Sequence, residues 1–152
     1  MKIKVICIGK TGKSFLQEGE NEYLNRLKHY CKLEKVELSD LKNARKLTEE
    51  QVKSEECKLM LQHIESGDQV FLLDEKGKTY TSVQFSNFLQ KRFNQGGKNL
   101  VFVIGGAYGF SAEMCDRAQG KVSLSGMTFS HQMIRMIFFE QVYRGLTILK
   151  GE

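Results

Sequence analysis

Two apolar runs in the last third of the chain each lead directly into a loop that contains glycine. Leu100–Ile104 is followed by Gly105–Gly109, and Val122–Leu124 is followed by Ser125–Phe129. Glycine leaves the backbone uncovered, so a ligand can reach N–H and C=O groups directly. Because ligands of α/β sheets usually bind at the carboxyl ends of strands, these loops predict a small-molecule pocket.

Strand and helix patterns alternate along the chain, and these elements must position the two loops. Thr48 followed by Gln51 forms a capping box that starts one of the helices. The alternation predicts an α/β fold in which helices flank a mostly parallel sheet. At this length we expect one domain over residues 1–152. The expected strands are Ile3–Ile8, Lys35–Leu38, Val70–Leu73, Leu100–Ile104 and Val122–Leu124, and the expected helices are about Phe15–Lys32, Thr48–Glu65, Ser82–Asn94, Ser111–Ala118 and Ser130–Ile148.

The charge balance favours an anionic partner. The sequence carries 23 Lys and Arg against 18 Asp and Glu, a formal net charge of +5. Nucleic acid is the first candidate for such a partner, and a solvated surface with a mild basic bias is the alternative. The side chains that could contact RNA phosphates are Lys10, Lys13, Arg26 and Lys28.

Other classes of protein are disfavoured by the composition. No stretch approaches the roughly 20 apolar residues of a membrane span, and Met1–Val5 alternates like a strand rather than a signal peptide. The four cysteines contain no C-x-x-C pair, which favours buried thiols in a cytoplasmic protein. The three histidines share no metal-ligand spacing, so we expect no metal.

The expected terminal helix is apolar around most of its girth. Glu140 and Arg144 stand one turn apart and could form an ion pair. A helix with two apolar stripes must be buried on more than one side, so we expect one side to cover the sheet and the other a second subunit. The alternative is a helix sunk in the core of a monomer. The stripes are Ile134, Ile137, Phe138, Val142 and Leu146, and Met133, Met136, Phe139 and Tyr143.

Three segments together make the chain similar to a known family. They are Gly105–Gly109, Leu124–His131 and Glu140–Arg144, and the Leu73–Gly77 turn adds to them. On these motifs the chain resembles the RlmH (YbeA) group of SPOUT methyltransferases over essentially its whole length. Those enzymes use S-adenosylmethionine to methylate N3 of a pseudouridine in large-subunit (23S) ribosomal RNA.

The resemblance implies a parallel sheet with a C-terminal trefoil knot, a homodimer, and rRNA or the assembled ribosome as substrate. The cofactor contacts of the family fall on Leu73, Gly105, Leu124, Ser125, Gly126, Met127, Thr128 and Phe129. The residues themselves agree with this, because leucine, methionine and glycine loops supply the apolar surface and backbone groups that adenine needs. Core and turn roles for the individual residues are the alternative.

Methylation of N3 requires the base to lose a proton, and two side chains could take part. His131 is the titratable group nearest to the second loop, and an imidazole changes charge near neutral pH. Its alternative role is to shape the loop. Arg135, one turn later, could contact a phosphate or the cofactor carboxylate, and a salt bridge to a partner subunit is the alternative.

Two other functions are alternatives to the methyltransferase. A dinucleotide-binding oxidoreductase is disfavoured because Gly105–Gly109 does not match G-x-G-x-x-G and follows a late strand. A non-catalytic RNA- or ribosome-binding factor on the same fold differs from the enzyme in not binding S-adenosylmethionine. Family chains usually continue into a Pro-Tyr-His tail beyond the position of Glu152, so no catalytic residue of that tail is assigned.

Overall fold

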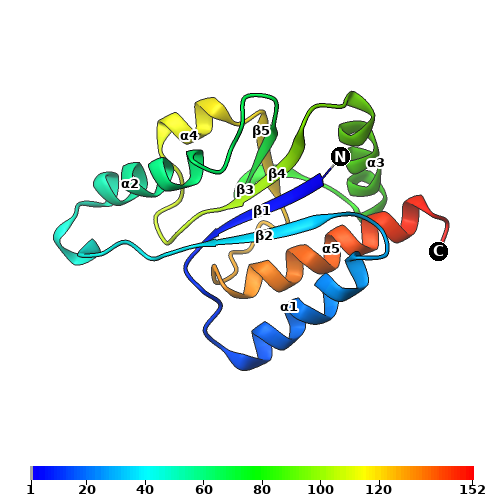
Figure 1. Ribbon diagram of the computed structural model, residues 1–152, viewed down its shortest axis with the longest axis horizontal. Helices are drawn as coiled ribbons and strands as arrows, with labels where there is room; N and C mark the ends of the chain where they lie inside the picture. Colours follow the sequence, from blue (N-terminus) through cyan, green and yellow to red (C-terminus); the bar gives the residue numbers. More distant parts are fainter. Residues whose placement is uncertain (1) are drawn as a thin grey trace.

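Five strands form a single sheet in the order β2-β1-β4-β3-β5, and every neighbouring pair is parallel (Figure 1). The computed structural model describes residues 2–152. The strands are β1 (Lys2–Ile8), β2 (Leu33–Leu38), β3 (Gln69–Thr79), β4 (Asn99–Ile104) and β5 (Gly120–Ser123). The helices are α1 (Ser14–Leu27), α2 (Glu49–Leu61), α3 (Ser82–Gln95), α4 (Ala112–Arg117) and α5 (Met133–Leu149), with a short 3-10 turn at Ala44–Lys46. The predicted α/β class is confirmed.

Helices cover both faces of the sheet (Figure 1). On one face, α1, α3 and α5 pack over a cluster that includes Phe102 and Phe138, whose ring centroids lie 4.8 Å apart. On the other face, α2 and α4 pack over a cluster that includes Met60 and Met114. Because β4 is covered on both faces, its residues 100–103 are fully buried, as expected for a central parallel strand.

Several helix boundaries differ from the predicted ones, and strand pairing and capping explain the differences. Helix α1 ends at Leu27, because Leu33 already pairs with Ile3 in the sheet and the chain turns between those points. Thr48 and Gln51 form the predicted capping box. Helix α3 begins at Ser82, and its N-cap is the preceding residue, Thr81, which forms a capping box with Gln84.

Strand β3 does not end at Leu73 as predicted. Leu73 is its last residue paired with β4, but the strand runs on to Thr79 beside β5. Both Leu73 and Lys78 pair with Val122, so the four residues between them bulge out of the strand. The predicted turn over Asp74–Gly77 is therefore a bulge within β3. A Cβ on Gly77 would lie 2.7 Å from the backbone of Lys121, so this close approach needs glycine.

The second apolar stripe of α5 packs on α1 of the same chain. Met136 lies so close to Gly19 that a Cβ on Gly19 would require the Met136 side chain to shift. The Tyr143 ring lies 6.1 Å from Tyr23 and 5.7 Å from Tyr30. Helix α1 therefore covers part of the second stripe within the same chain, while Met133, Met136 and Tyr143 remain partly exposed. The expected partner subunit stays a prediction. The predicted Glu140–Arg144 ion pair does not form, and Glu140 instead accepts a hydrogen bond from the Tyr23 hydroxyl at 3.0 Å.

None of the helices within residues 2–152 combines the length and the apolar character that a membrane crossing requires.

Candidate functional site

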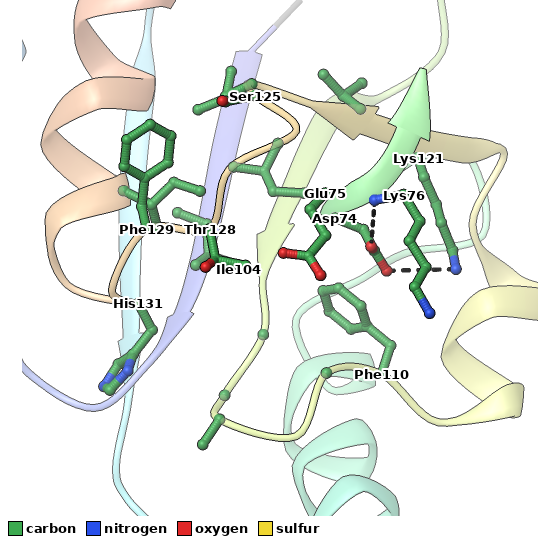
Figure 2. Close-up of a pocket in the computed structure, with 18 of the residues that line it drawn as sticks. Asp74, Glu75, Lys76, Ile104, Phe110, Lys121, Ser125, Thr128, Phe129 and His131 are labelled. Atoms are coloured by element: carbon green, nitrogen blue, oxygen red, sulfur yellow. Dashed lines mark hydrogen bonds and ion pairs between the residues drawn. The ribbon is translucent and has the colours of Figure 1, made fainter. Parts of the chain in front are cut away.

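A cleft of about 490 Å³ opens where β4 and β5 end, beside the bulge within β3 (Figure 2). It brings together seven of the eight predicted cofactor-contact residues, and the eighth, Gly126, does not line it. The lining side chains come from three segments that are far apart in sequence but adjacent in the sheet. The seven residues are Leu73, Gly105, Leu124, Ser125, Met127, Thr128 and Phe129.

The apolar inner part of the cleft is formed by the ends of β4 and β5 and by β3 at the point where its pairing with β4 stops. Leu73 pairs with Ile104 of β4 on one side and with Val122 of β5 on the other. All three side chains line the cleft and are at most 7% exposed. Parallel strands end at one edge, so residues separated by about fifty positions in the chain meet there.

The loop after β4 forms one wall. The N–H of Gly109 donates to the carbonyl of Gly106 at 3.2 Å, and Gly109 has a φ of +83° that favours glycine. A Cβ on Gly105 would lie 3.1 Å from the Phe110 ring, so the ring lies directly over the glycine. Tyr108 on the same loop is 49% exposed.

The loop after β5 forms the opposite wall. The Ser123 hydroxyl donates to the carbonyl of Ser125 at 2.8 Å, and the Met127 N–H donates to the Ser125 hydroxyl at 3.0 Å. Met127 is 78% exposed and Phe129 is 39% exposed. With Tyr108, three of the five large apolar side chains that are exposed in the described chain gather at this cleft. Such a concentration of exposed apolar surface is typical of a binding site.

The bulge of β3 adds charged groups to the cleft. Asp74 lies 3.5 Å from the Lys121 ammonium and accepts a hydrogen bond from the Lys76 N–H at 2.9 Å. Figure 2 shows the Glu75 carboxylate pointing into the cleft, between Phe110 on one side and Thr128 on the other. Glu75 forms no ion pair with any residue from 2 to 152. The cleft therefore combines apolar walls with an available negative charge.

The two predicted chemical residues have different positions. His131 is exposed and lines the cleft. Arg135 is only 1% exposed and does not line it. Its guanidinium donates to the carbonyls of Ile8 at 2.6 Å, Gly9 at 2.8 Å and His131 at 3.1 Å. Arg135 therefore links the end of β1 to the start of α5. Because its guanidinium is buried and already hydrogen-bonded, it does not make the expected contact with a phosphate or a cofactor carboxylate.

A buried carboxyl group supports the Gly105–Gly109 loop from behind. Glu56 of α2 is 6% exposed, and its Oε1 has no hydrogen-bond partner among residues 2–152. A Cβ on Gly106 would lie 2.5 Å from Glu56 Oε2. Burial raises the pKa of Glu56, and the negative charge of Asp40 adds to this effect. The loop and the carboxyl are thus in direct contact.

Sequence reasoning missed Glu75, Tyr108 and Phe110 as lining residues. Glu75 belongs to the Leu73–Gly77 motif, but a turn at this position does not determine whether its side chain points into the cleft. The bulge in β3 supplies that reason. Within residues 2–152, no group of three or more His, Cys, Asp or Glu side chains is placed to hold a metal ion.

Comparison with known proteins adds to this geometry. A family model described as "Predicted SPOUT methyltransferase" matches residues 1–152. A protein of Parabacteroides distasonis named "Ribosomal RNA large subunit methyltransferase H" is 52% identical over 152 residues, which is 100% of this chain and 97% of that protein. Proteins with the same name from Flavobacterium johnsoniae and Cytophaga hutchinsonii are 53% and 47% identical over the same shares.

Proposed function

The chain belongs to the SPOUT methyltransferase family, and on this premise we propose that it transfers the methyl group of S-adenosylmethionine to N3 of a pseudouridine in large-subunit (23S) ribosomal RNA. The observation that carries the proposal is the convergence of Leu73, Gly105 and Met127 on one cleft. The names of the relatives support large-subunit ribosomal RNA as the substrate class.

The cleft fits the proposed cofactor in size and chemistry. Its volume of about 490 Å³ lies in the range of small-molecule sites. Leu73, Leu124 and Met127 provide apolar surface for the adenine faces, and Gly105 leaves backbone groups open to its edge. S-adenosylmethionine also carries a sulfonium and an ammonium group, and the Glu75 carboxylate offers a favourable electrostatic environment to such cations.

The chain's residues would act mainly by positioning. Bound S-adenosylmethionine would supply a methyl group that is already activated on its sulfonium. Each loop is held in shape by an internal hydrogen bond, Gly109 to Gly106 in one and Met127 to Ser125 in the other. Fixed walls would hold the methyl group in line with the attacking nitrogen of the base. We assign the role of accepting the proton from N3 of the base to His131, since it lines the cleft and its imidazole ring is exposed to an incoming substrate.

The remaining parts of the proposal come from the family. The protein acts as a homodimer, carries the trefoil knot in its C-terminal part, and works in the cytoplasm on rRNA or on the assembled ribosome. The net charge of +5 supports an RNA partner.

Methyl transfer to ribosomal RNA is the direct test. Large ribosomal subunits prepared from cells that lack the gene are incubated with the protein and radiolabelled S-adenosylmethionine, and the modified nucleoside is located by mass mapping. We expect one N3-methylated pseudouridine. A label on another nucleoside, or a protein that binds S-adenosylmethionine but labels no RNA, would contradict the proposed reaction.

Calorimetry distinguishes the enzyme from a non-catalytic RNA- or ribosome-binding factor on the same fold. The enzyme binds S-adenosylmethionine, and such a factor does not. His131→Ala should leave this binding intact while methyl transfer falls about 10²-fold or more, the range for loss of a general base. Unchanged transfer in that variant would limit His131 to shaping the loop.

A further inference from the structure

The loop between β1 and α1 exposes two cations and an aromatic ring. Lys10 and Lys13 are exposed, and neither forms an ion pair with any part of the chain that the structure describes. Phe15 is 60% exposed. Helix α1 has no acidic residue in its first turn, so no nearby carboxylate on that turn offsets the two charges. We call residues 10–15 the lysine segment.

A partly buried polar network fixes the backbone of the lysine segment. The Thr11 N–H donates to Glu37 at 2.9 Å, and the Thr11 hydroxyl donates to Glu20 at 2.6 Å. Lys35 forms ion pairs with both of these glutamates. Burial opposes ionisation of Glu37, but the Thr11 N–H and the charges of Lys35 and Arg135 outweigh it and lower the pKa of that carboxyl. The segment is therefore held rigidly from beneath while its lysines remain outside.

Gln132 links the lysine segment to the cleft. The Gly12 N–H donates to Gln132 Oε1 at 2.8 Å, and Gln132 Nε2 donates to the Lys10 carbonyl at 3.2 Å. Gln132 directly follows His131, which lines the cleft. Figure 1 shows the loop after β1 beside the start of α5, in agreement with these bonds. The residue that lines the cleft and the residue that binds the lysine segment are thus neighbours in the chain.

We propose that the lysine segment docks the phosphate backbone of the RNA substrate and that Gln132 holds this docking surface in register with the cleft. The inference rests on the proposed function, because it concerns how the same substrate is oriented. Lysine ammonium groups neutralise phosphates, and an exposed aromatic ring can stack on a base. A segment that is rigid before binding loses little conformational entropy when RNA docks.

Lys10 and Lys13 are better placed for RNA contact than Arg26 and Lys28, the other two basic residues expected to contact phosphates. Arg26 is already paired with Glu22 at 2.7 Å and lies 5.4 Å from the centre of the Tyr23 ring. Lys28 lies at the far end of α1, about 22 Å from Lys13 by the rise of an α-helix. The segment next to the cleft is therefore the better phosphate contact.

A matched pair of charge variants tests the docking surface. Lys10→Ala/Lys13→Ala removes the two charges beside the cleft. Lys32→Ala/Lys91→Ala removes two exposed charges that form no ion pair within residues 2–152 and lie at the opposite edge of the sheet, where α1 and α3 end. Filter binding to large ribosomal subunits is measured over a range of salt concentrations from about 50 to about 200 mM, the range in which phosphate contacts change affinity strongly.

We expect the variant at the lysine segment to bind roughly 15- to 30-fold more weakly at about 0.15 M salt, and its slope of log affinity against log salt to be shallower by about 1.4–1.8. The opposite-edge control should bind like the wild type. Equal weakening in both double variants, or no weakening in either, would overturn the docking surface.

Gln132→Met tests the link between the lysine segment and the cleft, because methionine has a similar length but loses both hydrogen bonds to the segment. We expect the apparent KM for ribosomal subunits to rise about three- to tenfold, with the salt slope and the affinity for S-adenosylmethionine unchanged. A wild-type KM would overturn the role of Gln132. If the wild-type protein failed to bind S-adenosylmethionine, the proposed function would be refuted. The docking surface would still be decided separately, by the binding of the charge variants to ribosomal subunits.

Discussion

Adding one methyl group at Gly106 is a stringent test of how the cleft wall is built. A Cβ there would lie 2.5 Å from Glu56 Oε2, 2.8 Å from Oε1 and 3.0 Å from Cδ. Atoms in contact normally stay about 3.5 Å apart or more. Glu56 is 6% exposed and comes from α2, so its carboxyl group has little room to retreat. We therefore expect Gly106→Ala to push the Gly105–Gly109 loop toward the cleft.

The size of the effect follows from the cost of overpacking. One inserted methyl group at a tightly packed site destabilises a protein by about 1–3 kcal/mol. If the displaced loop costs roughly 1 kcal/mol more in the cofactor-bound protein than in the free protein, the affinity for S-adenosylmethionine falls about fivefold. The variant should therefore lose stability in urea unfolding and lose affinity in calorimetry, while its far-UV circular dichroism stays unchanged.

Removing the carboxyl group should relieve the clash. In Gly106→Ala/Glu56→Ala, the space left by the Glu56 side chain accommodates the new methyl group. We expect this double variant to regain at least half of the stability lost by Gly106→Ala, a coupling of about 1 kcal/mol between the two positions. A Gly106→Ala protein with wild-type stability and affinity would refute the reasoning, and so would strictly additive effects of the two substitutions.

Three further predictions follow from individual side chains. Arg135→Met leaves the carbonyls at the end of β1 and Glu37 without their buried donor, so it should lower the free energy of unfolding by about 3–5 kcal/mol in urea. Because burial raises the pKa of Glu56, folding binds its proton more tightly, and stability is lost as pH rises through the window between its ordinary and raised values. Glu56→Gln should thus be more stable than the wild type at about pH 7 and lose this advantage near pH 4; an equal gain at both would contradict the raised pKa. Gly126 has no atom within 4 Å of a Cβ whereas Gly105 faces the Phe110 ring at 3.1 Å, so Gly105→Ala should weaken S-adenosylmethionine binding in calorimetry more than Gly126→Ala does, and the reverse order would count against the cleft geometry.

The pattern of apolar runs was sufficient to predict the sheet class and the meeting of three neighbouring strands at one edge, although it placed the end of β3 too early. Parallel strands flanked by helices place their carboxyl ends at one edge, so Leu73, Gly105 and Met127 could be brought together before any coordinates. The capping box at Thr48 is likewise a local feature, and local rules predict it.

Features that depend on contacts between elements distant in the sequence could not be predicted from local patterns. The spacing of Arg135 from His131 is visible in the sequence, but the position of α5 against the end of β1 is not, and that contact buries the guanidinium. Glu140 lies one turn from Arg144, yet α1 offers it the Tyr23 hydroxyl. Glu75 faces the cleft only because the double pairing of Val122 forces a bulge into β3.

A backbone amide NMR titration with S-adenosylmethionine tests the central claim most directly, because it reports which residues surround the bound cofactor. The described residues form a second, smaller hollow of about 300 Å³ lined by Leu41, Lys42, Leu47, Gln51, Ser54 and Glu55, which serves as an internal control. The account predicts that the largest saturable shift changes fall at Leu73, at Gly105 and its loop, and at Leu124–Phe129. Changes centred on the second hollow, or no saturable change at these three segments, would contradict it.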